Sequence, residues 1–160
     1  MGGPKYDNGG GGPNYQCLPE EPEWDDFVQG EQTASRIYGV EYERSHSQDV
    51  FDDTNAGSVP RYNNPAPCAV CYVNRHSILM VPAKMQCPDG WRKEYGGFLV
   101  GDLYGRYRTD YVCFDKAPEI AVGRTNGDQG VIYPVEVICG TLPCSKYINY
   151  REMTCVVCSK

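Results

Sequence analysis

Residues 67–91 decide the fold, because strand-forming and cross-linking residues are densest there: Pro67-Cys68-Ala69-Val70-Cys71-Tyr72, then Leu79-Met80-Val81-Pro82-Ala83-Lys84, then Cys87-Pro88-Asp89-Gly90-Trp91. The Cys-x-x-Cys spacing returns at the far end, in Thr154-Cys155-Val156-Val157-Cys158. Two such units belong either to a metal site or to a disulfide framework. Most of the functional interpretation depends on that choice.

The residues between the paired cysteines favour disulfides over a structural zinc site. A zinc knuckle places both thiolates on one side of a tight turn, whereas alanine and valine between them favour a strand. Along a strand, residues i and i+3 point to opposite faces of the sheet. Cys68 and Cys71 are then expected to face opposite ways, as are Cys155 and Cys158, and each is expected to cross-link to a different neighbour.

The composition indicates one disulfide-rich domain from an oxidising compartment. The chain has 160 residues, a length that suits one domain, and it contains 9 cysteines. Such a cysteine load predicts a secreted, extracellular protein. Because nine is odd, one thiol is free, pairs outside this chain, or has a partner on a missing segment. The disulfide candidates are Cys17, Cys68, Cys71, Cys87, Cys113, Cys139, Cys144, Cys155 and Cys158. Cys139 and Cys144 enclose a short turn and are the first choice for a local pair.

The net charge of −6 argues against a nucleic acid partner, because phosphate binding needs a basic face. No apolar run of 18 residues exists, so we expect no membrane span. The polar start, Met1 to Pro4, contains no recognisable signal peptide, so we expect a mature fragment or an added initiator methionine. With only two histidines, a histidine-rich metal site is excluded.

Short strand-forming segments separated by glycine and proline predict an all-β fold, a disulfide-rich antiparallel sandwich or barrel with long loops. We divide the chain into a Gly/Pro-rich N-terminal segment, 1–16, which alone suggests a flexible linker or part of a truncated domain, and a single β domain, 17–160. Residues 44–66 are expected to form a long surface loop. The expected strands span residues 35–43, 68–74, 77–84, 92–103, 107–115, 130–139 and 151–158.

The order of these motifs resembles the C-terminal non-collagenous domain of the sponge short-chain (spongin-type) collagens, a domain that recurs in secreted proteins of other invertebrates. The likeness covers nearly the whole chain and rests on residues 15–19, 38–42, 68–72, 79–84, 87–91, 94–99, 113–116, 130–133, 135–137, 139–144 and 154–160. The resemblance implies an extracellular structural or adhesive domain that forms homo-oligomers or binds matrix proteins, and it brings no catalytic residues.

Two departures from that family matter. Its usual tryptophan- and cysteine-containing opening is absent, and with it a tenth cysteine, so we expect a truncated start and one unpaired thiol in this chain. The collagenous Gly-X-Y stem is also absent, so triple-helix formation is not ascribed to this chain.

Catalysis has little support in the sequence. A nucleophilic mechanism needs an activated serine or cysteine beside a histidine base, and the histidines are His46 and His76. Neither lies near a Gly-x-Ser-x-Gly elbow or a thiol at a motif spacing. We interpret both as exposed turn residues and predict that the protein is not an enzyme; a hydrolase built on His76 and Ser77 is kept only as a test.

Calcium is the one cofactor that the sequence leaves open. Asp49, Asp52, Asp53 and Asn55 place hard oxygen donors in one loop, and residues 126–129 supply more in another. Neither loop completes an EF-hand pattern, because the closing glutamate is missing. Solvated acidic loops are the simpler interpretation.

The second binding candidate is a group of aromatic and basic side chains, Tyr104, Arg106, Tyr107, Arg108 and Tyr111. Tyrosine and arginine recur at interface hot spots, and tyrosine beside aspartate or asparagine suits sugar faces. Packing of strand tyrosines on neighbouring strands is the alternative. Two functions therefore stay open: a non-enzymatic matrix assembly or adhesion domain, and a lectin-like protein that binds glycans with or without calcium.

Overall fold

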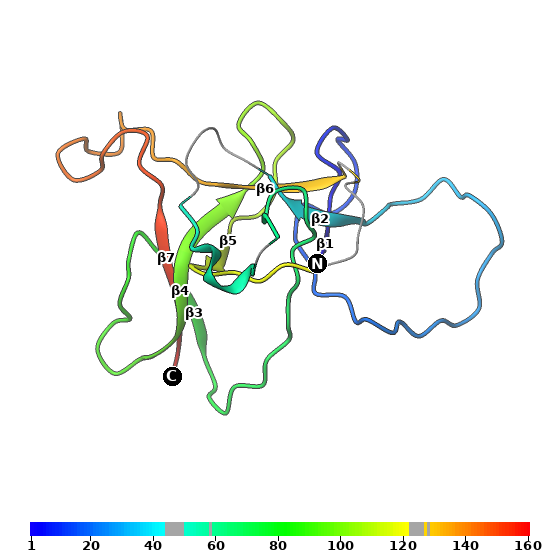
Figure 1. Cartoon of the computed structure of the whole chain (residues 1–160), viewed down its shortest axis with the longest axis horizontal. Coiled ribbons are helices and arrows are strands. Elements are labelled where there is room, and N and C mark those ends of the chain that lie inside the picture. The colour runs from blue at the N-terminus through cyan, green and yellow to red at the C-terminus, as the bar shows by residue number, and fades with distance from the viewer. Residues whose placement is uncertain (44–49, 58, 122–126, 128) are drawn as a thin grey trace.

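The computed structural model describes residues 1–43, 50–57, 59–121, 127 and 129–160. Within these residues the regular elements are strands and a single 3-10 turn, so the chain is all-β, as the sequence predicts. The strands are β1 (Gly2–Gly3), β2 (Tyr38–Tyr42), β3 (Ile78–Pro82), β4 (Arg92–Gly101), β5 (Val112–Asp115), β6 (Gly130–Pro134) and β7 (Thr154–Ser159), and the turn η1 covers Asp53–Asn55 (Figure 1).

The strands form one curled, half-barrel sheet in the order β1-β2-β6-β4-β7-β3, and β5 pairs with β4 off this path. The pair β2–β6 is parallel, and the other strand pairs are antiparallel. The long β4 is the hub, because it pairs with β5, β6 and β7. Figure 1 shows it running through the middle of the molecule; β7 lies beside it, and β3 follows beyond β7 in the strand order.

The curl of the sheet centres on Gly97. Cys113 on β5 and Cys155 on β7 form a disulfide although β4 lies between their strands. Their Cα atoms are 5.7 Å apart, whereas a flat sheet separates second-neighbour strands by about 9.5 Å. Gly97 pairs with both flanking strands, and a Cβ there would lie 2.5 Å from the backbone nitrogen of Lys116. A residue without a side chain therefore permits the fold about β4.

Eight of the nine cysteines form a disulfide framework. Besides Cys113–Cys155, the bonds are Cys17–Cys68, Cys87–Cys158 and the local pair Cys139–Cys144 that the turn predicts. Cys155 and Cys158 bond to different partners, as strand alternation requires. Cys71 is a free cysteine on the surface.

The predicted strand 68–74 is wrong. This segment forms no strand in the structure, and the side chains of Val70 and Tyr72 are almost wholly exposed. A strand needs a neighbour that shares its hydrogen bonds, and among the described residues this segment forms no ladder with β3 or with any other strand. The alternation argument therefore does not apply to Cys68 and Cys71, although the disulfide conclusion for Cys68 stands.

The N-terminal segment packs on the sheet through contacts that a flexible linker lacks. β1 pairs with β2, and Gly2 exchanges two backbone hydrogen bonds of 2.8 Å with Gln16. The amino group of Met1 donates to the carbonyl of Ala66 at 2.9 Å. Residues 1–16 thus cover one end of the sheet.

The main hydrophobic core lies between β2, β4, β5 and β6, and its buried members are Val40, Tyr42, Ala66, Val100, Phe114 and Ile132. Arg61 closes one side of it: its side chain is 3% exposed, it pairs with Asp53, and its guanidinium carbon lies 5.0 Å from the centre of the Phe51 ring. A second cluster holds Leu99 with the Cys113–Cys155 disulfide. The two clusters lie on opposite faces of β4, since Leu99 and Val100 alternate.

Candidate functional site

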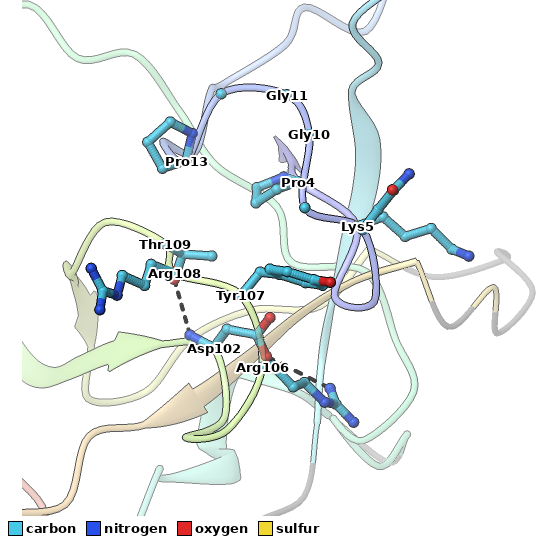
Figure 2. Close-up of a pocket in the computed structure, with 13 residues that line it drawn as sticks. Pro4, Lys5, Gly10, Gly11, Pro13, Asp102, Arg106, Tyr107, Arg108 and Thr109 are labelled. Carbon is cyan, nitrogen blue, oxygen red and sulfur yellow. Dashed lines mark hydrogen bonds and ion pairs between the residues drawn. The ribbon is translucent and has the colours of Figure 1, made fainter.

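The loop between β4 and β5, residues 102–111, carries the five predicted aromatic and basic residues, and the structure separates them. Arg106, Tyr107 and Arg108 line a shallow depression of about 400 Å³ that faces the N-terminal segment (Figure 2). Tyr104 is 94% exposed, and neither it nor Tyr111 lines the depression. The five predicted residues therefore lie in one loop but do not form one site.

Glycines of the N-terminal segment form the opposite wall of the depression. A Cβ at Gly9 would lie 3.0 Å from Cε1 of the Tyr107 ring, so the glycine backbone lies directly against that ring. The N–H of Asp110 donates to the carbonyl of Pro13 at 3.0 Å, which fixes the segment to the loop. The N–H of Asp102 donates to Oγ1 of Thr109 at 3.0 Å and closes the base of the loop. The glycine segment thus offers backbone groups to the depression, and Tyr107 of the facing loop offers an aromatic ring.

Arg106 stabilises the loop from within. Its guanidinium carbon lies 4.2 Å from the centre of the Tyr6 ring, and its Nη1 lies 3.6 Å from Oδ1 of Asp102. The Asp102 side chain is only 5% exposed, and this burial raises the pKa of its carboxyl group although the Leu103 N–H and Arg106 act to lower it. The exposed Tyr107 and Arg108 are thus better placed than Arg106 to contact a partner.

The predicted calcium ligands have partners inside the protein. Asp52 caps η1 by accepting from the N–H of Thr54 at 2.9 Å, Asp53 pairs with Arg61, and Nδ2 of Asn55 donates to the carbonyl of Ala117 at 2.6 Å. Asp49 lies outside the described residues, as do Asn126 and Asp128 of the second loop. In the described part of the chain, no group of three or more His, Cys, Asp or Glu side chains could hold a metal ion. The carboxylate of Asp52 therefore caps η1, and the carboxylate of Asp53 forms an ion pair with Arg61.

The residues kept for the hydrolase test lie where the β3–β7 ladder begins. His76 and Ser77 are exposed, and their backbone N–H groups donate to the carbonyl of Lys160 at 3.1 and 3.0 Å. His46 falls outside the described residues. The structural role of the His76–Ser77 pair is to extend the ladder by one step.

The edge of the sheet at β3 is a feature that the sequence did not single out. Ser77 and Lys160 exchange two backbone hydrogen bonds, and the N–H of Ala83 donates to the carbonyl of Thr154. The backbone N–H and C=O groups of the odd-numbered residues of β3 therefore point toward β7. The N–H and C=O groups of Ile78 and Met80 therefore point away from the sheet. Among the described residues, no hydrogen bond to these groups is present.

Basic side chains lie at the ends of β3 and on the neighbouring strands. The stretch from residue 75 to 94, with the last residue of the chain, carries five basic side chains against two acidic ones, Asp89 and Glu94. The basic ones are Arg75, Lys84, Arg92, Lys93 and Lys160. Arg75 precedes β3, Lys84 follows it, and Lys160 pairs with Ser77 next to its first residue, whereas Arg92 and Lys93 lie on β4, on the far side of β7.

Acidic side chains predominate in residues 18–35, which we call the acidic arm. Every residue of the arm is exposed, and Figure 1 shows it as a wide loop that leaves the sheet and returns to β2. Its acidic residues are Glu20, Glu21, Glu23, Asp25, Asp26 and Glu31, and its large apolar residues are Leu18, Trp24, Phe27 and Val28. The sequence signal for this feature was the mixture of acidic and large apolar residues without any strand or helix period.

No family model, no curated protein and no solved structure matches this chain. The class of protein is therefore set by the fold: a small, disulfide-framed, all-β domain. Disulfides of this number in a small domain are consistent with an extracellular or secreted protein. In the described ranges, no helix is long and apolar enough to cross a membrane.

Proposed function

We propose that the protein is a secreted, non-enzymatic assembly or adhesion domain that associates with other copies, and with matrix proteins, through the open edge of β3. The observation that carries this proposal is the unpaired edge itself. The N–H and C=O groups of Ile78 and Met80 have no hydrogen-bond partner among the described residues, and the side chain of Ile78 is 59% exposed. The resemblance to the spongin-type non-collagenous domain supports the same kind of function.

An open apolar edge is unusual for a monomer. Proteins protect edge strands with prolines, charges or covering segments, because an exposed edge pairs with other chains. Here Pro82 blunts only the far end of β3, and the preceding segment adds the exposed side chains of Val70 and Tyr72. Exposed apolar surface of this kind marks an interaction site.

The test is sedimentation velocity of the oxidised protein over a wide concentration range. We expect concentration-dependent association, weakened at least about tenfold by Ile78→Lys, because a charge on the edge opposes strand pairing. Ile138→Lys is the matched control, since Ile138 is 61% exposed but lies away from the edge. A wild-type protein that stays monomeric at every concentration would refute the proposal of self-association.

A second function, binding of glycans, is favoured by the depression beside Tyr107. An exposed tyrosine ring, Arg108 and backbone groups of the glycine run line one shallow surface, which suits the apolar face and hydroxyls of a sugar. On a glycan array we expect Tyr107→Ala to abolish binding and Tyr104→Ala to leave it unchanged. Repeating the array with a chelator tests the need for calcium, and a blank array with the wild-type protein removes this candidate.

A further inference from the structure

We propose that the partner of the β3 edge is the acidic arm of a second copy, so that copies join head to tail. The inference rests on the proposed self-association and names the two surfaces that meet. One surface is the open edge of β3 with the basic residues at its ends, and the other is the extended segment 23–28 of the acidic arm.

Charge complementarity selects the arm as the occupant. The arm contains six acidic residues and no basic residue, whereas Arg75, Lys84 and Lys160 lie at the ends of β3 and β3 itself carries no charge. Opposite potentials steer such surfaces together and suppress the alternative in which two β3 edges meet, because that pairing brings basic residues face to face. The arm is thus the better match for the edge within a second copy.

Backbone hydrogen bonding fits the same pairing. Residues 23–28 contain no proline, and within the described chain residues 19–30 make no hydrogen bond or ion pair to the sheet. Apart from the Asp26 N–H, which donates to Oδ1 of Asp25 at 2.8 Å, the N–H and C=O groups of residues 23–28 are therefore available to Ile78 and Met80. An extended segment that adds to a sheet edge gains affinity from main-chain bonds and specificity from its side chains.

Apolar anchors are present on both surfaces. Trp24 is 83% exposed and Phe27 is nearly as exposed in the single copy, and Ile78 and Leu79 are exposed on the edge. Tryptophan is the residue type most enriched at interface hot spots. Burial of Trp24 against β3 removes two exposed apolar surfaces at once.

The two surfaces lie at different places on one copy, since the arm leaves the sheet beside β2 whereas β3 is at the other end of the strand order (Figure 1). A contact between unlike surfaces is heterologous, and each added copy presents a fresh edge and a fresh arm. The structure thus points to open chains of copies, which suits a protein that builds an extended material.

The experiment exchanges charges between the two surfaces. The first variant carries Glu23→Lys, Asp25→Lys and Asp26→Lys in the arm. The second carries Lys84→Glu and Lys160→Glu at the two ends of β3, two residues whose side chains make no hydrogen bond or ion pair with the described chain. Each variant alone is expected to associate at least about tenfold more weakly than wild type, because segment 23–28 of the arm and the edge of the same variant then have charges of the same sign. An equimolar mixture is expected to recover association, because each arm again meets an edge of opposite charge.

Fluorescence of Trp24 provides the second measurement. In a Trp91→Phe background Trp24 is the sole tryptophan, since the chain has two. Its emission is expected to shift to the blue and to resist acrylamide quenching as the protein concentration rises. Emission that is already blue-shifted and does not change with concentration would overturn the proposal, because the arm would then cover its own sheet.

The outcomes separate the two proposals. If the arm variant associates as strongly as wild type while Ile78→Lys still abolishes association, the arm is not the partner although the edge is the interface. If the mixture of the two charge variants fails to recover association, the arm–edge contact is refuted. If the wild-type protein never associates, the proposed function fails first. Glu136→Lys, at an exposed site away from both surfaces, is the control for a change in net charge alone.

Discussion

Replacing Gly97 with alanine tests whether the curl of the sheet depends on a missing side chain. The added Cβ would overlap the carbonyl oxygen of Phe114 and lie 2.5 Å from the nitrogen of Lys116 and 2.6 Å from the carbonyl carbon of Asp115. All three atoms are backbone, so no side chain can turn aside. Relief therefore requires β5 to move away from β4 by about 1 Å, to reach ordinary van der Waals separation.

The free-energy cost of that movement can be worked from the contacts. It stretches the hydrogen bonds on either side of Gly97, including the one from Lys116 N–H to the Gly96 carbonyl at 3.3 Å. Two weakened bonds cost about 1 kcal/mol each, and overpacking adds about 1–3 kcal/mol. We expect a loss of about 3–5 kcal/mol in the free energy of unfolding and a Tm lower by roughly 6–20 °C.

The assay is urea unfolding of the oxidised protein, followed by far-UV circular dichroism. Gly39→Ala is the matched control, because Gly39 also lies in a strand and a Cβ there meets no atom within 4 Å. That control is expected to change stability by less than about 1 kcal/mol. Equal midpoints and slopes for the two variants would refute the argument that Gly97 permits the curl.

Three further predictions concern the cysteine count, the buried arginine and the pH dependence. Alkylation of the folded, non-reduced protein is expected to add one group per chain, at the exposed Cys71, and Cys71→Ser should add none; several modified thiols would contradict the four disulfides. Arg61→Met is expected to lower the free energy of unfolding by about 2–4 kcal/mol in a urea titration, since it removes the partner of Asp53 and the cation over the Phe51 ring. Burial raises the pKa of Tyr15 to about 12, so the folded protein holds this proton longer than the unfolded chain, whose tyrosine pKa is about 10. Stability from Tyr15 is therefore complete below about pH 10 and falls as the pH rises toward 12, and Tyr15→Phe should make the loss of stability shallower in that range.

Local sequence rules predicted the strands that have partners. Residues 78–82 and 154–159 pair with each other, and the alternation of side chains along β7 sends Cys155 and Cys158 to different partners. The same rules failed for residues 68–74, where alanine, valine and tyrosine favour a strand but the segment pairs with no strand of the described chain. Strand propensity describes how a residue fits a sheet and does not say whether a sheet is there.

The candidate site was less predictable because its geometry depends on contacts between distant segments. Arg106 is turned inward by Tyr6, a hundred residues earlier in the chain, and by the buried carboxylate of Asp102. Nothing in the local pattern of residues 104–111 distinguishes Arg106 from Arg108, which lines the depression with Tyr107. The calcium prediction for Asp52, Asp53 and Asn55 likewise could not foresee the cap on η1 or the pairing with Arg61.

The two edge strands of the sheet differ in whether the described chain covers them, and this difference supports a functional edge at β3. At the β1 end, Gly2 exchanges two hydrogen bonds with Gln16, so the chain covers its own edge. At the β3 end, the described chain leaves the N–H and C=O groups of Ile78 and Met80 uncovered, between the basic residues Arg75 and Lys84 that flank β3 in the sequence. The N-terminal segment closes the β1 edge through backbone hydrogen bonds, whereas no described segment closes the β3 edge in this way. Because exposed edges favour aggregation, an edge kept open within a disulfide-fixed framework is best explained by a partner that pairs with it.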